Sequence, residues 1–282
     1  MNYKEGELNQ ESLDFLEGIA RVAEAKYVVG DISQEELYKI HLEIARLNNS
    51  VQNTEQERSS KETRLNILLN RDSESPLGIP QLSEEASFNV DIKSLYQSTI
   101  MNQPELLIFS YAIEKNKNAK LLAKKSFFPD LMASFVQRGI ASGALGPWDI
   151  MLSFNIPLWF WAKQKYQVKE AIANLEEAEA TYKAIQNKTF AEVKDLAVKI
   201  GISKNKIKLY KTSLIPILES SIESSLSAFG SGRGEFMMLL DSKRMLVETK
   251  MNYYKALVEY NMDLADLERQ VGGNLRGVKN EK

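Results

Sequence analysis

Side chains that commonly take part in chemistry are scarce in this sequence. It has no cysteine and a single histidine, His41, so it has neither a disulfide framework nor a thiolate metal site. A lone histidine on a helix is more often a surface or packing residue than a ligand. The sequence also lacks a glycine-rich phosphate loop after a strand and a nucleophile motif. We therefore expect no catalytic site, no metal site and no cofactor.

The most distinctive short stretch is rich in glycine and lies between two helical patterns. It reads Phe229-Gly-Ser-Gly-Arg-Gly-Glu-Phe. A fainter copy, Tyr27-Val-Val-Gly30, lies upstream, and pairing Tyr27 with Phe229 places Gly30 opposite Gly232 at the same offset of 202 residues. Glycine permits a positive φ and the close approach of another backbone. The sequence therefore predicts two helical hairpins of one design, each with a tight turn.

The overall composition is typical of a helical protein. The chain has 282 residues, of which 26% are charged, with few glycines and prolines and a net charge of −2. Such a balance gives no basic field for nucleic acid. No apolar run approaches the roughly 18–20 residues of a membrane-spanning helix, and the first residues lack the basic and apolar regions of a signal peptide. We therefore expect long helices and no nucleic-acid partner.

Residues 1–72 are predicted to form the first helical hairpin. Its first helix ends at Gly30, which serves as a C-terminal cap. Ser33 followed by Glu36 is a capping box, so the second helix begins almost at once. Residues 73–90 contain prolines, a glycine and several serines, which indicate a linker.

Residues 91–273 contain the only strand signals. Pro104 fits the first turn of a helix, because a backbone N–H at that position would have no partner within the helix. A β-hairpin is predicted at about 130–156, and its second strand, 150–156, alternates apolar side chains with methionine, serine and asparagine. An isolated hairpin is marginal in water. This one therefore has to pair with strands elsewhere in the chain or in another copy.

A helix of unusual length is predicted after the β-hairpin. Apolar residues keep a three-and-four spacing from about 162 to 229, like a coiled-coil seam, and that span is about 100 Å long at 1.5 Å per residue. Pro216 should bend this helix or offset one turn. The turn at 229–236 reverses the chain, and a last helix precedes a polar tail, 274–282, which we expect to be disordered. The predicted fold is mainly α, with long antiparallel coiled-coil-like helices and one inserted β-hairpin.

This order of elements resembles the TolC-like outer-membrane efflux proteins, and four short motifs carry the resemblance. They are Asn102-Gln-Pro-Glu-Leu106 at a helix start, Phe128-Pro-Asp-Leu131 before the first strand, Asn155-Ile-Pro-Leu158 after the second strand, and Leu239-Leu-Asp-Ser-Lys-Arg244 after the turn. The last motif is most similar to the heavy-metal and cation-efflux branch. The resemblance covers nearly the whole chain.

The resemblance implies one part of a trimeric channel in which an α-barrel continues into a β-barrel. Members of the family carry two helix–hairpin–helix units with four strands per protomer, whereas this sequence has one β-hairpin. We therefore expect an N-terminally truncated member, whose missing part held the other hairpin and the signal peptide. The expected location is the outer membrane, with the helices in the periplasm.

The resemblance also implies roles for individual residues. Asp241 matches an aspartate at the inner mouth of related channels, where three copies would form a carboxylate ring that constricts the pore and attracts cations. Its alternative is an ordinary exposed acid on a helix. Trp159 and Trp161 would lie at the membrane–water boundary, and their alternative is packing in a soluble core.

The two turns would be the periplasmic tips that meet an adaptor protein. The tip residues in this interpretation are Tyr27, Gly30, Phe229, Gly232 and Arg233. The alternative is that each is a plain tight turn with no partner.

Two functions are compatible with these features. The first is a passive exit duct for substrates such as cations or drugs, a homotrimer that works with a periplasmic adaptor protein and an inner-membrane pump and is not an enzyme. The second is a soluble coiled-coil adaptor or scaffold protein. The second accounts for the long helices but leaves the alternation at 150–156 and the 202-residue repeat unexplained.

Overall fold

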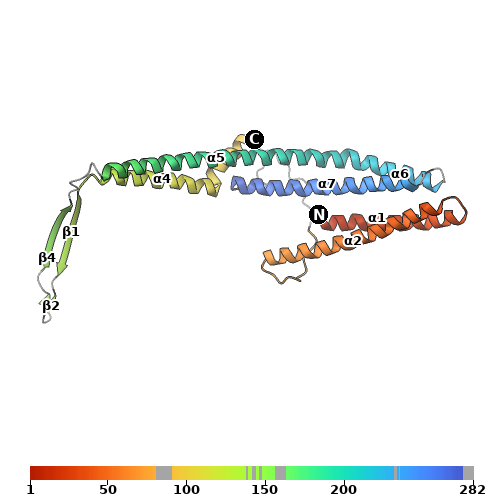
Figure 1. The fold of residues 1–282 in the computed structure, drawn as a ribbon, viewed down its shortest axis with the longest axis horizontal. Helices are drawn as coiled ribbons and strands as arrows, with labels where there is room; N and C mark the ends of the chain where they lie inside the picture. The colour runs from red at the N-terminus through yellow and green to blue at the C-terminus, as the bar shows by residue number, and fades with distance from the viewer. Residues whose placement is uncertain are drawn as a thin grey trace. The chain divides into compact units, whose positions relative to one another are not determined.

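The computed structural model describes residues 1–80, 91–137, 139–141, 144–145, 148–155, 163–231, 234 and 236–275 (Figure 1). The chain divides into two compact units. One consists of Met1–Asn89 with Asp195–Leu267, and the other of Val90–Lys194 with Glu268–Lys282. The boundaries inferred above, at 72 and 90, remain a prediction.

The first unit begins with a helical hairpin of α1 (Asn2–Val28) and α2 (Gln34–Leu68). Gly30 lies in the turn with φ at +84°, as expected of a C-terminal cap. The predicted capping box is confirmed. The Glu36 N–H donates to the Ser33 hydroxyl over 3.2 Å, and the Ser33 N–H donates to the Glu36 carboxylate over 3.1 Å. Local hydrogen bonds thus end one helix and start the next within six residues.

A second helical hairpin in the same unit consists of α6 (Ile215–Gly230) and α7 (Phe236–Val271). Val28 and Gly230, the last residues of α1 and α6, differ by 202 positions, and so do Gln34 and Phe236, the first residues of α2 and α7. The predicted offset therefore holds for the helix ends as well as for the glycines. Most of α7 belongs to this unit.

The long predicted helix is divided by a π-helical turn. It consists of α5 (Gln164–Leu209), the π-helix η1 (Tyr210–Leu214) and then α6. Pro216, in the first turn of α6, has no N–H to donate and its ring crowds the carbonyl four residues back. A π turn changes the hydrogen-bond spacing at that point and accommodates the proline. The predicted offset of one turn is confirmed.

The core of the first unit lies where the two helical hairpins meet. Leu16, Ile19, Ala20 and Ala23 from α1 and Ile40 from α2 form a cluster with Phe229 from α6 and with Phe236, Leu239 and Leu240 from α7. Buried polar side chains between the helices form hydrogen bonds with the backbone of their own helix. The Ser12 hydroxyl donates to the Leu8 carbonyl over 2.7 Å, and the Thr54 hydroxyl donates to the Ser50 carbonyl over 2.8 Å, which lets both side chains be buried.

The second unit contains α3 (Ile92–Asn102), α4 (Pro104–Lys125) and the first part of α5. Pro104 stands in the first turn of α4 as predicted, and the Leu106 N–H donates to the Gln103 side chain over 2.6 Å. The ring of Tyr96 stacks on that of Phe190 with 4.4 Å between centroids, which joins α3 to α5. The end of α7 packs on the α3–α4 junction, where Gly272 has φ at +73°.

The β-hairpin consists of β1 (Asp130–Gln137) paired antiparallel with β4 (Trp148–Asn155). Asp130 is opposite Asn155, and Gln137 is opposite Trp148. Between β1 and β4 in the sequence lie two short paired strands, β2 (Ile140–Ala141) and β3 (Ala144–Leu145). The strand pairing thus resumes beyond β1 and β4.

Candidate functional site

The turn between α6 and α7 is closed by a glycine that the sequence motif did not single out. The Gly234 N–H donates to the Ala228 carbonyl over 3.0 Å. A Cβ at Gly234 would lie 2.9 Å from the Ala228 Cβ and 3.0 Å from backbone atoms of Ala228 and Phe229, so only glycine fits without displacement. Gly232 and Arg233, two predicted tip residues, lie outside the described residues.

Phe229 and Tyr27 occupy equivalent positions but have different environments. Phe229 is 3% exposed, and its ring meets that of Phe236 edge-on with 6.2 Å between centroids. The Lys26 ammonium from α1 lies 5.7 Å from the centroid of the Phe229 ring. Tyr27 is 41% exposed. Phe229 thus supports the turn from inside, while Tyr27 and Gly30 are accessible at the α1–α2 turn.

Asp241 lies on the exposed side of α7, with 61% of its side chain accessible. Its carboxylate is 3.8 Å from the guanidinium of Arg244, one helical turn on. Arg244 also donates two hydrogen bonds to Glu43 on α2, over 3.1 and 2.5 Å. The hydrogen bonds to Glu43 raise the pKa of the Arg244 guanidinium. This bidentate pair joins the two helical hairpins. Its residues are 201 positions apart, so no local sequence pattern predicts it.

Lys243 lies beside a shallow apolar groove between α1, α2 and α7. The groove is lined by the apolar residues Leu16, Leu47, Leu240 and Val247 and by the polar or charged residues Ser12, Glu43, Lys243, Arg244 and Glu248. The Lys243 ammonium is 4.8 Å from the centroid of the Phe15 ring. Burial lowers the pKa of Lys243 from its ordinary value of 10.5, and Glu11 partly opposes that shift.

Replacement of Lys243 by methionine should raise the urea midpoint of unfolding at pH 7. A lysine whose pKa is lower in the folded than in the unfolded protein destabilises the fold while protonated, and this penalty disappears as the pH approaches 10.5. The advantage of Lys243→Met over the wild-type chain should therefore shrink between pH 7 and pH 10.5. The exposed Lys255 on the same helix provides the control, because Lys255→Met should change little at either pH. A lower midpoint for Lys243→Met at pH 7 would contradict this prediction.

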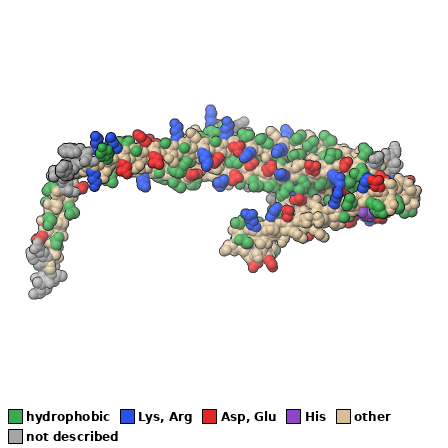
Figure 2. All heavy atoms as spheres, viewed as in Figure 1, with side chains coloured by type: hydrophobic (Ala, Val, Ile, Leu, Met, Phe, Trp, Pro, Cys, Tyr) green, Lys and Arg blue, Asp and Glu red, His purple; other side chains and the backbone are tan. Residues whose placement is uncertain are grey.

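The β1–β4 hairpin has one strongly apolar face and one mixed face. Directly opposite residues in an antiparallel pair point to the same side, so the register defines both faces. The apolar face consists of Leu131, Ala133, Phe135, Gln137, Trp148, Ile150, Leu152 and Phe154. The mixed face contains Asp130, Met132, Ser134, Val136, Asp149, Met151 and Ser153. The large apolar side chains of both faces are exposed in this chain. Figure 2 shows hydrophobic side chains on the surface of the strands.

The described part of the chain has no helix that is both long and apolar enough to cross a membrane. The same residues contain no cluster of three histidine, aspartate or glutamate side chains suited to a metal ion. Trp159 and Trp161, the predicted boundary aromatics, lie outside the described residues, so their location stays a prediction.

Comparison with known proteins gave one family and several similar structures. The family described as outer membrane efflux protein matches residues 95–273. A comparison with curated proteins found no match. The fold is similar to that of VceC, an outer membrane protein from Vibrio cholerae, with a TM-score of 0.78 and 15% sequence identity over 97% of this chain and 66% of VceC.

Two further channel structures have the same fold. CusC, whose crystal structures concern folding and transmembrane channel formation, has a TM-score of 0.80 and 14% identity over 97% of this chain and 65% of its own. The open state of the MtrE outer membrane channel from Neisseria gonorrhoeae has a TM-score of 0.75 and 17% identity over 97% of this chain and 63% of its own. The chain thus spans less than two thirds of the length of each of these three proteins.

Proposed function

Because the chain belongs to the outer membrane efflux protein family, we propose that it is a channel subunit of a tripartite efflux or export system. In this function it is a passive exit duct in the outer membrane, with its long helices in the periplasm. The transported substrates are cations or drugs, and the driving force comes from an inner-membrane pump. The family gives no support to the alternative of a soluble coiled-coil scaffold.

The observation that carries this proposal is the two-faced β-hairpin. Its apolar face suits contact with lipid, and its mixed face suits contact with water or with other strands. A two-stranded sheet leaves its outer edges unpaired, and a bilayer does not tolerate unpaired backbone groups. The hairpin therefore has to be closed by strands from other subunits, which supports a homo-oligomer such as the trimer that the family resemblance implies.

The two helical turns are the proposed contact surface for a periplasmic adaptor protein. They belong to one compact unit, and their helices form a common core. Tyr27 and Gly30 are both exposed in the α1–α2 turn. In the α6–α7 turn, the buried Phe229 and the closely packed Gly234 hold the backbone in place for a partner. Gly232 and Arg233 belong to the same proposed surface.

The channel proposal is tested by reconstituting the purified full chain with phospholipid vesicles and planar bilayers. Co-flotation with vesicles and discrete single-channel currents are the expected results. Recovery of the folded chain only in the aqueous fraction, with no currents, would contradict the channel and favour the scaffold.

In a complete channel, Asp241→Asn should weaken block of the current by Mg²⁺ from the periplasmic side. In a trimer, three Asp241 carboxylates would converge at the pore mouth, and removing them should raise the blocking concentration by roughly fivefold or more, given about 1 kcal/mol for a charge pair near 4 Å in water. The matched control is Glu248→Gln, an exposed acid seven residues further along α7. Equal block in wild-type and Asp241→Asn channels would exclude Asp241 from the constriction.

A further inference from the structure

The end of the helical pair that bears the β-hairpin is unusually basic. Between Lys115 and Lys169 the sequence has eight lysines and one arginine but only two aspartates, Asp130 and Asp149. Four of these lysines flank the helix–strand junction. Lys124 and Lys125 lie in the last turn of α4, and Lys163 and Lys165 lie at the start of α5. All four are exposed, and Figure 2 shows basic side chains at this end of the helices next to the strands.

Helix stability accounts for only half of this lysine cluster, defined as Lys124, Lys125, Lys163 and Lys165. Cations are favourable at the C-terminus of a helix, where Lys124 and Lys125 lie. They are unfavourable at the N-terminus, where Lys163 and Lys165 lie, and the first turn of α5 has no acidic residue to offset them. The two α5 lysines therefore need another explanation.

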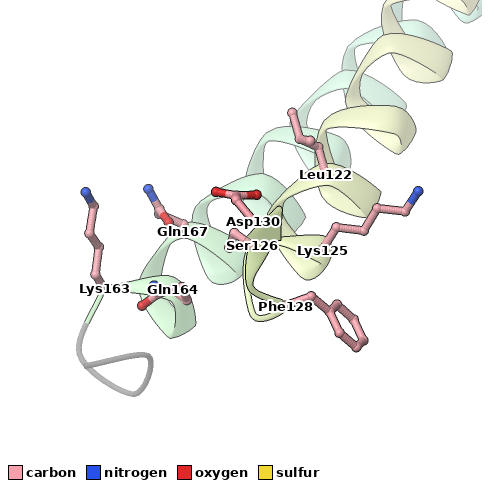
Figure 3. Close-up of a pocket in the computed structure, with 8 residues that line it drawn as sticks. All are labelled: Leu122, Lys125, Ser126, Phe128, Asp130, Lys163, Gln164 and Gln167. Carbon is pink, nitrogen blue, oxygen red and sulfur yellow. The ribbon is translucent and has the colours of Figure 1, made fainter. Parts of the chain in front are cut away.

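Charge pairing among the described residues does not provide that explanation. Lys125, Lys163 and Asp130 line one open pocket between the ends of α4 and α5 (Figure 3). In that view Lys125 and Lys163 extend outward on opposite sides of Asp130. Among the ion pairs of the described residues, none involves a member of the lysine cluster. Within the part of the chain that the structure describes, no ion pair thus occupies these four charges.

The surroundings of the lysine cluster indicate which kind of anion would bind there. Phe128, which lines the same pocket, is 71% exposed, and the apolar face of the β-hairpin begins at Leu131. Long lysine side chains can place their ammonium groups in water while their stems and nearby aromatic rings contact lipid. A basic patch directly beside a lipid-facing surface is complementary to the negative phosphates of a membrane leaflet.

We propose that the lysine cluster binds the headgroups of anionic phospholipids in the leaflet that the hairpin enters. This inference rests on the proposed function, because it requires the hairpin to insert into a bilayer. The cluster then sets the depth at which the strands stop and the helices begin. It also gives the protein a preference for anionic over zwitterionic membranes.

The test is vesicle co-flotation of the full chain with two lipid compositions. One is phosphatidylcholine alone, and the other is phosphatidylcholine mixed with the anionic lipid phosphatidylglycerol. The wild-type chain should bind the anionic vesicles at least about tenfold more tightly, and the preference should fall as salt is added. Replacing all four cluster lysines by glutamine should remove the preference but leave binding to phosphatidylcholine unchanged.

Two further variants make the result specific. The first replaces Lys204, Lys206, Lys208 and Lys211 by glutamine. These lysines are exposed and lie 39 or more positions beyond the cluster in the sequence, so the anionic preference should persist. The second replaces the four cluster lysines by arginine and should also keep it. An undiminished preference in the cluster glutamine variant would overturn the inference while leaving the channel intact. Failure of the wild-type chain to bind either vesicle would instead overturn the proposed function.

Discussion

Replacing Gly272 with alanine is expected to lower the free energy of unfolding by about 3 kcal/mol. A Cβ at this position would lie 2.5 Å from the Asn102 carbonyl oxygen and 2.6 Å from its carbon. These are backbone atoms of the α3–α4 junction, which Gln103 and Pro104 fix by capping α4. They cannot rotate away as a side chain could. The positive φ of Gly272 adds a conformational cost for any residue with a Cβ.

The neighbouring Gly273 provides the matched control for Gly272. A Cβ at Gly273 would meet nothing within 4 Å, so Gly273→Ala should change the urea midpoint by far less. Equilibrium unfolding of the full chain, followed by circular dichroism, measures both variants. Equal midpoints for Gly272→Ala and Gly273→Ala would refute the close approach of α7 to the α3–α4 junction.

Signals carried by neighbouring residues predicted much of this fold. The capping box of Ser33 and Glu36 depends only on residues three apart, and the absence of a side chain at Gly30 permits its positive φ at the helix end. Pro216 disturbs the helix because of its own ring. Each of these features could be inferred without knowing which helices pack together, because the physical cause lies within one or two turns of the chain.

Features that depend on packing between distant segments could not be predicted in this way. Arg244 and Glu43 are 201 residues apart, and either would be an ordinary exposed charge if α2 and α7 were not adjacent. The need for glycine at Gly234 follows from its distance to the Ala228 backbone, which sequence spacing does not reveal. The lysine cluster combines residues from α4 and α5 that are 38 or more positions apart in the sequence.

Alignment of the repeat also did not predict the difference in burial between Phe229 and Tyr27. Alignment at an offset of 202 makes these two aromatic residues equivalent, and both were expected at a tip. The residue that packs on Phe229 is Phe236, the first residue of α7, and the equivalent first residue of α2 is Gln34. An amide cannot provide the apolar contact that a second ring gives. Equivalent positions in the two hairpins therefore differ in burial, 3% for Phe229 against 41% for Tyr27.

This difference in burial predicts that alanine substitution lowers the free energy of unfolding much more at Phe229 than at Tyr27. Phe229→Ala should lower the free energy of unfolding by about 3–5 kcal/mol, because it opens a cavity in the cluster that joins the hairpins. It also removes the ring beneath the Lys26 ammonium, a contact between α6 and α1. Tyr27→Ala should cost less than about 1 kcal/mol, as expected for an exposed residue.

Two measurements on both variants separate the two roles. Urea unfolding reports whether the residue stabilises the turn, and adaptor binding reports whether it contacts the partner. If Tyr27 is a contact residue, Tyr27→Ala should weaken adaptor binding at unchanged stability. Phe229→Leu, which keeps most of the buried volume, should retain both stability and binding, since Phe229 is proposed to act through the backbone of the turn. Loss of binding in a fully stable Phe229→Leu variant would show instead that the ring itself reaches the partner.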